Sequence, residues 1–99
     1  MGHVVIATWK AKPGARDKVI RVLEEMTPGN RGEPKTLHFQ AQVSTSDPDT
    51  IVLYEHYTDP SGYEDHRATE AFRTRVLGEA IELLADRKLE TFTTIDPDQ

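Results

Sequence analysis

Residues 50–72 have the sequence TIVLYEHYTDPSGYEDHRATEAF, which predicts a strand, a sharp turn and a short helix in succession. Residues 50–57 begin apolar and end aromatic or ionisable, as expected for a buried strand. The turn can start a helix, because Asp59 or Ser61 can accept hydrogen bonds from free N–H groups and Pro60 fits a first helical turn. We expect any functional site where these elements meet, among four ring-bearing side chains: Tyr57, Tyr63, His66 and Phe72.

The chain before this stretch predicts a strand followed by a helix. Residues 3–11 are rich in β-branched side chains and are apolar on both faces in their first half, which indicates a strand covered on both sides. Residues 15–26 carry apolar side chains at helical spacing. The following TPGN at residues 27–30 is expected to end that helix.

The rest of the chain predicts one hairpin, one helix and a last strand. Residues 35–45 alternate between apolar and polar side chains, and a turn at residues 46–49 joins them to the next strand in an antiparallel hairpin. Residues 69–85 carry a wide apolar stripe that suits a helix packed on a sheet. A final strand is expected over residues 88–95, before a polar tail at residues 96–99.

This order of elements predicts an α+β chain with the ferredoxin-like β-α-β-β-α-β arrangement, an antiparallel sheet with its helices on one face. Two helices cannot cover both faces of the sheet, yet residues 3–11 and 50–57 carry apolar side chains in both phases. A second copy, packed sheet against sheet, is the simplest cover. We therefore expect a homodimer.

Composition excludes several classes of protein. The 99 residues suffice for one small domain over residues 1–99, and the net charge of −5 argues against a nucleic-acid partner. The absence of cysteine excludes disulfides and thiol catalysis and suits a reducing cytosol. No apolar run approaches the roughly 20 residues of a membrane span, and no signal-peptide pattern opens the chain. We expect a cytoplasmic protein that binds neither a membrane nor nucleic acid.

Four ordered blocks resemble the antibiotic biosynthesis monooxygenase family. They are WKAKPG at residues 9–14, RGEPKTL at residues 31–37, VLYE-x-Y at residues 52–57 and Y-x-x-H-x-x-T-x-x-F at residues 63–72. The resemblance extends over residues 4–95 and implies a dimeric α+β barrel, in which two ferredoxin-like sheets close against each other. It also implies a cofactor-independent monooxygenase acting on a small aromatic, polyketide-like or quinol substrate.

A branch of that family binds and degrades haem. At the position that resembles the axial histidine of this branch, one turn after Phe72, the present chain has Val76, which cannot ligate iron. The resemblance therefore implies no cofactor, and haem degradation is the weaker alternative. A second alternative is a non-catalytic dimeric module that binds a small aromatic or apolar ligand.

His66 is the candidate catalytic residue. An imidazole can exchange a proton near neutral pH, which the deprotonation of a phenol or hydroquinone requires. The alternative is a structural role, in which His66 packs the short helix and bonds a carbonyl group. The candidate substrate-binding residues, for which ordinary core packing is the alternative, are Trp9, Tyr57, Tyr63 and Phe72.

Glu55 lies late in an otherwise apolar strand, and a buried carboxylate needs a partner. It could act as a base, but we favour a salt link or hydrogen bond at the dimer seam, and Arg31 with Glu33 could form such a link. The side chains of residues 54–57 alternate between the two faces of the sheet, and either face could hold the site.

No motif for a metal or nucleotide is present. The four histidines lack H-x-x-H and H-E-x-x-H spacing, so we expect no metal. The sequence also has no glycine-rich phosphate loop and no G-x-S-x-G, which disfavours nucleotide cofactors and hydrolase chemistry.

Overall fold

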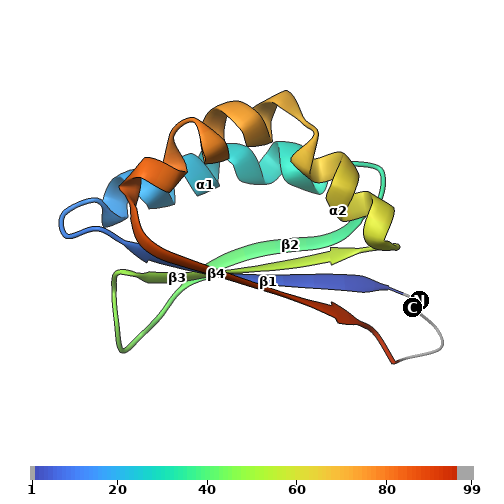
Figure 1. Cartoon of the computed structure of the whole chain (residues 1–99), viewed down its shortest axis with the longest axis horizontal. Coiled ribbons are helices and arrows are strands. Elements are labelled where there is room, and N and C mark those ends of the chain that lie inside the picture. Colours follow the sequence, from blue (N-terminus) through green and yellow to red (C-terminus); the bar gives the residue numbers. More distant parts are fainter. Residues whose placement is uncertain (1, 96–99) are drawn as a thin grey trace.

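The computed structural model describes residues 2–95 and confirms the predicted ferredoxin-like α+β class. A four-stranded antiparallel sheet, with the order β2-β3-β1-β4, carries all helices on one face (Figure 1). The predicted tail at residues 96–99 lies outside the described residues. The elements in chain order are β1 (His3–Ala11), α1 (Arg16–Arg31), β2 (Thr36–Val43), β3 (Thr50–Tyr57), α2 (Pro60–Arg67), the π-helical η1 (Phe72–Leu77), the 3-10 helix η2 (Ala80–Leu83) and β4 (Leu84–Thr93).

The core lies between the sheet and the helices. Odd-numbered residues of the central strands β1 and β3 point towards the helices, so that Ala7 lies opposite Leu53 and Trp9 opposite Ile51. Val19 and the following apolar residues of α1 pack on this face, as the helical spacing predicted. The core therefore uses one face of each central strand.

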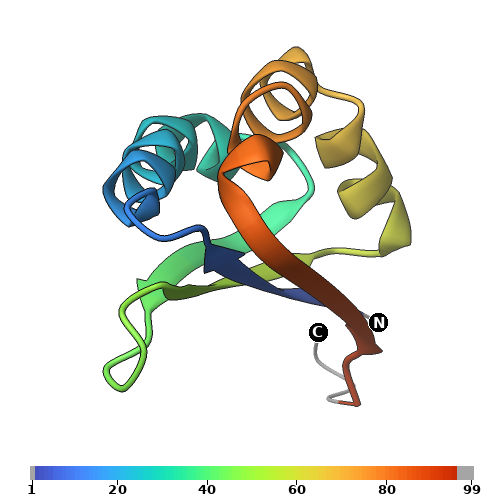
Figure 2. The same ribbon diagram turned by 60° about the vertical axis from the view of Figure 1, so that its left-hand side comes forward.

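The other face of the sheet is not covered by any described element. The helices lie on one side of the sheet when the molecule is turned (Figure 2). The open face carries apolar side chains from β1, β3 and β4 beside polar ones, and Phe92 is 40% exposed. The expected cover by a second copy remains a prediction. The apolar residues of this face are Val4, Ile6, Val52, Tyr54 and Phe92.

The predicted end of the first helix is wrong. α1 continues through Pro28 to Arg31, although a proline inside a helix removes one backbone hydrogen bond. The last turn is held from outside the helix, since Asn30 is buried and Arg31 Nε donates to the Phe39 carbonyl of β2, so tertiary contacts override the TPGN signal. The helix ends instead at Gly32, whose N–H donates to the carbonyl groups of Pro28 and Gly29.

The single helix predicted over residues 69–85 is also wrong. This stretch forms the π-helical η1 and the 3-10 helix η2, and β4 begins at Leu84 rather than at residue 88. The break falls at Gly78, whose N–H bonds the carbonyl of Arg73, five residues earlier. A Cβ at Gly78 would lie 2.7 Å from the carbonyl oxygen of Thr74, so the tight backbone there requires glycine.

β2 follows the predicted alternation from Phe39 onwards. Phe39 is buried, and Ala41 and Val43 pack against the core. Leu37 is the exception, at 54% exposed, because the pairing with β3 shifts register between Thr36 and His38.

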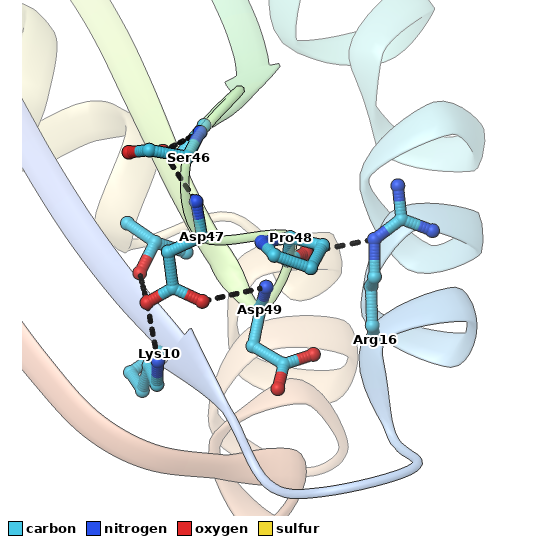
Figure 3. A network of polar contacts seen from close by, with 8 residues as sticks. Lys10, Arg16, Ser46, Asp47, Pro48 and Asp49 are labelled. Atoms are coloured by element: carbon cyan, nitrogen blue, oxygen red, sulfur yellow. Dashed lines mark hydrogen bonds and ion pairs between the residues drawn. The ribbon is translucent and has the colours of Figure 1, made fainter.

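The predicted turn at residues 46–49 is confirmed, and a polar network ties it to the rest of the fold (Figure 3). The Asp47 carboxylate pairs with the Lys10 ammonium of β1 and accepts a hydrogen bond from the Thr50 hydroxyl at 2.8 Å. These bonds, the one from Lys10 first, lower the pKa of Asp47. Arg16 Nε donates to the Pro48 carbonyl at 2.7 Å, which fixes the turn to α1.

Candidate functional site

A cleft of about 650 Å³ lies between one edge of the sheet and the α2–η1 segment. β1 and β4 form one side, α2 and η1 form the other, and Glu55 of β3 also lines it. The wall is largely apolar and includes three aromatic rings. Its main residues are Ala7, Trp9, Tyr63, Phe72, Val76 and Leu89.

The local sequence explains why α2 lies so close to the end of β3. The Asp59 side chain caps α2 by accepting a hydrogen bond from the Ser61 N–H at 2.8 Å, as predicted for one of these two residues. Gly62 then faces Tyr57, and a Cβ at this position would lie 2.8 Å from the Tyr57 Cβ. This close approach places the Tyr63 ring 5.9 Å from the Tyr57 ring. The helix is therefore seated directly over the end of β3.

Glu55 is the one buried carboxyl group of the cleft, with only 4% of its surface exposed. Its Oε1 accepts a 2.6 Å hydrogen bond from the Tyr57 hydroxyl, two residues further along the same face of β3. Within residues 2–95, Oε2 has no hydrogen-bond partner. Burial raises the pKa of Glu55, while the bond from Tyr57 and the proximity of His66 act in the opposite direction. The group can thus exchange a proton at a higher pH than an exposed carboxyl.

Tyr57 is completely buried and stays protonated to an unusually high pH. Burial raises its pKa, and the neighbouring Glu55 carboxyl raises it further. Tyr57 is not among the residues that line the cleft. It lies behind Glu55 and orients that carboxyl group, whereas the sequence had suggested direct substrate contact.

His66 is 3% exposed and does not line the cleft. Its Nδ1 donates to the Glu33 carboxylate, 3.0 and 3.1 Å from the two oxygens, and its ring lies edge-on to Phe72 at 5.3 Å. An inner void of about 20 Å³ is lined by both His66 and Glu55, with Asn30 also at its wall. A void of that size has room for one water molecule, and Glu55, His66 and Asn30 are the polar residues in its otherwise apolar wall.

The other sequence-predicted residues divide between the cleft and its surroundings. Trp9, Tyr63 and Phe72 line the cleft. Glu55 forms a hydrogen bond, as one interpretation expected, but with Tyr57 of the same chain on the helix-facing side of the sheet; its place at a dimer seam stays a prediction. The proposed link between Arg31 and Glu33 is also absent: Arg31 Nε donates to the Phe39 carbonyl, and Glu33 pairs with His66.

One sequence signal for Glu55 was present but was given too little weight. A lone carboxyl group in an apolar strand needs a polar partner. Tyr57, at the i+2 position on the same face, has a hydroxyl group that can serve as this partner. That pairing predicts a hydrogen bond within one chain and needs no dimer.

The donor set does not fit haem or another metal. No histidine lines the cleft, and Val76 occupies its wall. His56 lies on the open face, on the opposite side of the sheet from His66. In residues 2–95 no three histidine, aspartate or glutamate side chains are grouped to hold a metal ion.

Comparison with known proteins gives a family match over most of the chain. A family model described as antibiotic biosynthesis monooxygenase matches residues 2–76, which include Trp9, Glu55, Tyr63 and Phe72. No curated protein matches the chain. None of the helices in residues 2–95 has the length and apolar character needed to cross a membrane.

Solved structures share the fold. A protein described as an antibiotic biosynthesis monooxygenase is 29% identical, with a TM-score of 0.86 over 94% of this chain and 98% of the other. Rv0793 from Mycobacterium tuberculosis is 21% identical, with a TM-score of 0.90 over the whole of both chains. PA3566 from Pseudomonas aeruginosa is 24% identical, with a TM-score of 0.88 over 95% of this chain and 94% of the other.

Proposed function

The chain belongs to the antibiotic biosynthesis monooxygenase family, and from that membership we propose that it is a cofactor-independent monooxygenase for a small aromatic, polyketide-like or quinol substrate. The observation that supports this most directly is the cleft itself. It combines an aromatic wall, suited to a flat ring, with the single buried carboxyl of Glu55.

In such a reaction the substrate supplies the electrons that reduce oxygen. Removal of a proton from an acidic ring CH₂ or hydroxyl group leaves an electron-rich anion, which forms a C–O bond with O₂. For an anthrone-type CH₂, loss of the second hydrogen and cleavage of the O–O bond give a ketone and one water molecule. A quinol gives a hydroxyquinone and one water molecule. The protein has to move protons, stabilise the anion and exclude water.

Glu55 is the group that meets these demands in the cleft. As a carboxylate it takes the substrate proton, and its raised pKa makes it a stronger base than an exposed carboxylate. It then returns the proton to the peroxide oxygen. It takes the second ring proton as the O–O bond breaks and hydroxide leaves, and it gives that proton to the hydroxide to form water. The Tyr57 hydroxyl holds one carboxyl oxygen and leaves the other free to turn towards the substrate. Trp9, Tyr63 and Phe72 hold the ring.

In this proposal His66 exchanges protons with Glu55 and does not contact the substrate. It pairs with Glu33, which is partly exposed to solvent, and shares the inner void with Glu55. A water molecule in that void would connect the two groups, so His66 is a positioning and proton-relay residue rather than one that touches the substrate.

The enzyme is also proposed to be a homodimer, formed through the open face of the sheet. Pairing two such faces would remove the apolar side chains of β1, β3 and β4 from water, including the 40% exposed Phe92. Analytical ultracentrifugation at micromolar concentration should give twice the 11.2 kDa of one chain. A mass of one chain would contradict this part of the proposal.

Oxygen uptake with a panel of anthrones and hydroquinones tests the activity. The Glu55→Gln variant keeps the shape of the side chain and should lose about 10²- to 10⁴-fold in rate, as expected for a lost general base. The matched control is Glu64→Gln, which changes an exposed carboxyl at the same cleft and should retain most of the rate. His66→Ala should shift the pH profile of the rate.

Two outcomes would contradict the proposal. If Glu55→Gln and Glu64→Gln consume oxygen equally fast, Glu55 is not the base. If the wild-type protein consumes no oxygen above buffer while the same compounds raise its melting temperature, the chain is the non-catalytic binding module.

A further inference from the structure

Two arginine side chains line the cleft and have no carboxylate partner within residues 2–95. Arg67 comes from the end of α2, and Arg87 comes from β4, across the cleft, where it lies opposite Trp9 on the helix-facing side of the sheet. Neither is within ion-pair distance of a carboxylate in the described residues, whereas cations elsewhere, such as Lys10 and Arg75, are paired.

The positive charge of these two arginines contrasts with the acidic chain as a whole. The whole sequence has a net charge of −5. Two carboxyl groups also line the cleft: Glu64 is exposed on α2, and Glu55 is buried and bonded to the Tyr57 hydroxyl. Because neither arginine is paired with a carboxylate in residues 2–95, both are available to attract an anionic group of a ligand.

Both arginines lie beside aromatic residues of the cleft. The Arg67 guanidinium carbon lies 5.6 Å from the centre of the Tyr63 ring, a cation–π distance. Arg87 lies opposite Trp9 in the register of β4 with β1. Each guanidinium group can therefore pair with negative charge on a ring that packs against this wall.

We propose that the cleft binds an aromatic acid. The flat ring packs against Trp9, Tyr63 and Phe72, and its carboxylate is held by Arg67 and Arg87. Guanidinium groups suit this role, because they bind a carboxylate through paired N–H donors and stay charged at all relevant pH values. The proposal deepens the proposed function by naming its substrate class, and it rests on that function only for the oxidation of the bound ring.

This arrangement also orients the ligand. The arginines come from exposed positions on α2 and β4, while Glu55 is buried on the central strand β3. A ring whose carboxylate points to the arginines presents its opposite edge to Glu55. An anthrone that carries its carboxylate on an outer ring has this polarity, because its oxidisable CH₂ group lies on the central ring.

Binding of two redox-inert probes tests the inference apart from any oxygenase activity. 2-Naphthoate and 2-naphthamide have the same ring and nearly the same shape, but only the first carries a charge. Isothermal titration calorimetry at low salt should show that naphthoate binds about tenfold more tightly, which corresponds to about 1.4 kcal/mol. The difference should shrink as salt is added.

Substitutions then locate the anion subsite. The Arg67→Gln and Arg87→Gln double variant should lose the preference for naphthoate and bind naphthamide as before. The matched control is Arg73→Gln, an exposed arginine of η1 that does not line the cleft, and it should keep the preference. Melting curves confirm that each variant is folded.

Three results would overturn the inference: equal binding of the two probes by the wild type, an equal loss in the Arg73 control, or no binding of either probe. Failure of the proposed function looks different. If naphthoate is preferred but no aromatic acid supports oxygen uptake, the anion subsite stands and the oxygenase does not. If oxygen uptake depends on Glu55 but neutral rings are oxidised equally well, the oxygenase stands and the anion subsite does not.

Discussion

The buried carboxyl of Glu55 should make the stability of the folded protein depend on pH in a defined direction. Burial raises its pKa above the ordinary value of 4.5. Above pH 4.5 the unfolded chain therefore releases this proton first, while the folded chain keeps it until a higher pH. The folded state binds more protons in that window, so the free energy of unfolding falls as pH rises towards the folded-state pKa.

The Glu55→Gln variant removes this dependence with little change in shape. Glutamine keeps an oxygen that can accept the Tyr57 hydroxyl, but it cannot ionise. Relative to wild type, the variant should gain stability from pH 4.5 upwards and level off above the folded-state pKa of Glu55. The gain is about 1.4 kcal/mol for each pKa unit of the rise. For a domain of this size, each such step raises the melting temperature by roughly 5–10 °C.

Urea unfolding between pH 4 and pH 9, followed by the fluorescence of the single tryptophan, measures the difference directly. Protein concentration is held constant, because assembly would add to the apparent stability. The other titratable groups around Glu55 are present in both proteins, so their effects largely cancel in the difference; they are Glu33, Tyr57, Tyr63 and His66. Wild-type and variant stabilities that run parallel from pH 4.5 to pH 8 would refute the raised pKa. Glu64→Gln serves as the exposed control.

Three further outcomes follow from the same cluster. Tyr57→Phe removes the only hydrogen-bond donor to Glu55 among residues 2–95. It should cost about 1–3 kcal/mol in urea unfolding at neutral pH, because a buried carboxyl oxygen loses its partner. An unchanged midpoint would contradict this. Because folding raises the pKa of Tyr57 above 10.0, the wild type should lose stability above pH 10 more steeply than Tyr57→Phe, and equal slopes there would count against the shift. Gly62→Ala places a methyl group 2.8 Å from the Tyr57 Cβ. It should therefore lower the free energy of unfolding by about 1–3 kcal/mol and slow oxygen uptake. Gly29→Ala is the control for the loss of a glycine, because a Cβ at that position meets open space.

The parts of the fold that could be predicted from sequence are those with short-range causes. The limits of β3 follow from strand propensity. The turn before α2 follows from Pro60, and the N-terminal cap of α2 follows from the Asp59 side chain. All three causes act within a few residues. The continuation of α1 beyond Pro28 depends instead on contacts with the sheet, such as the bond from Arg31 Nε to the Phe39 carbonyl, which no local pattern contains. The π-helical η1 likewise depends on how the chain turns at Gly78.

The candidate site divides in the same way. Helical spacing brought Tyr63 and His66 to one side of α2, and the structure places Tyr63 on the cleft wall. The extent to which each of these side chains is buried could not be predicted. His66 lies in the interior because Glu33, 33 residues away in the chain, supplies its partner, and that contact exists only after α1 and α2 have packed. The exposure of Glu55 to the cleft depends on β3 lying beside β1 with this register.

The π-helical η1 has a consequence for how a ligand reaches the cleft. Its hydrogen bonds span five residues, as from Gly78 to Arg73, and the segment ends in a single 3-10 turn, so its backbone ladder is weaker than that of α1. Phe72, Val76 and Leu77 of this segment form part of the cleft wall. In hydrogen–deuterium exchange, residues 72–83 should therefore lose protection well before β1 and β3. Local unfolding of this segment would widen the cleft for rings that are too bulky for its closed form, while the paired strands β1 and β3 keep their register.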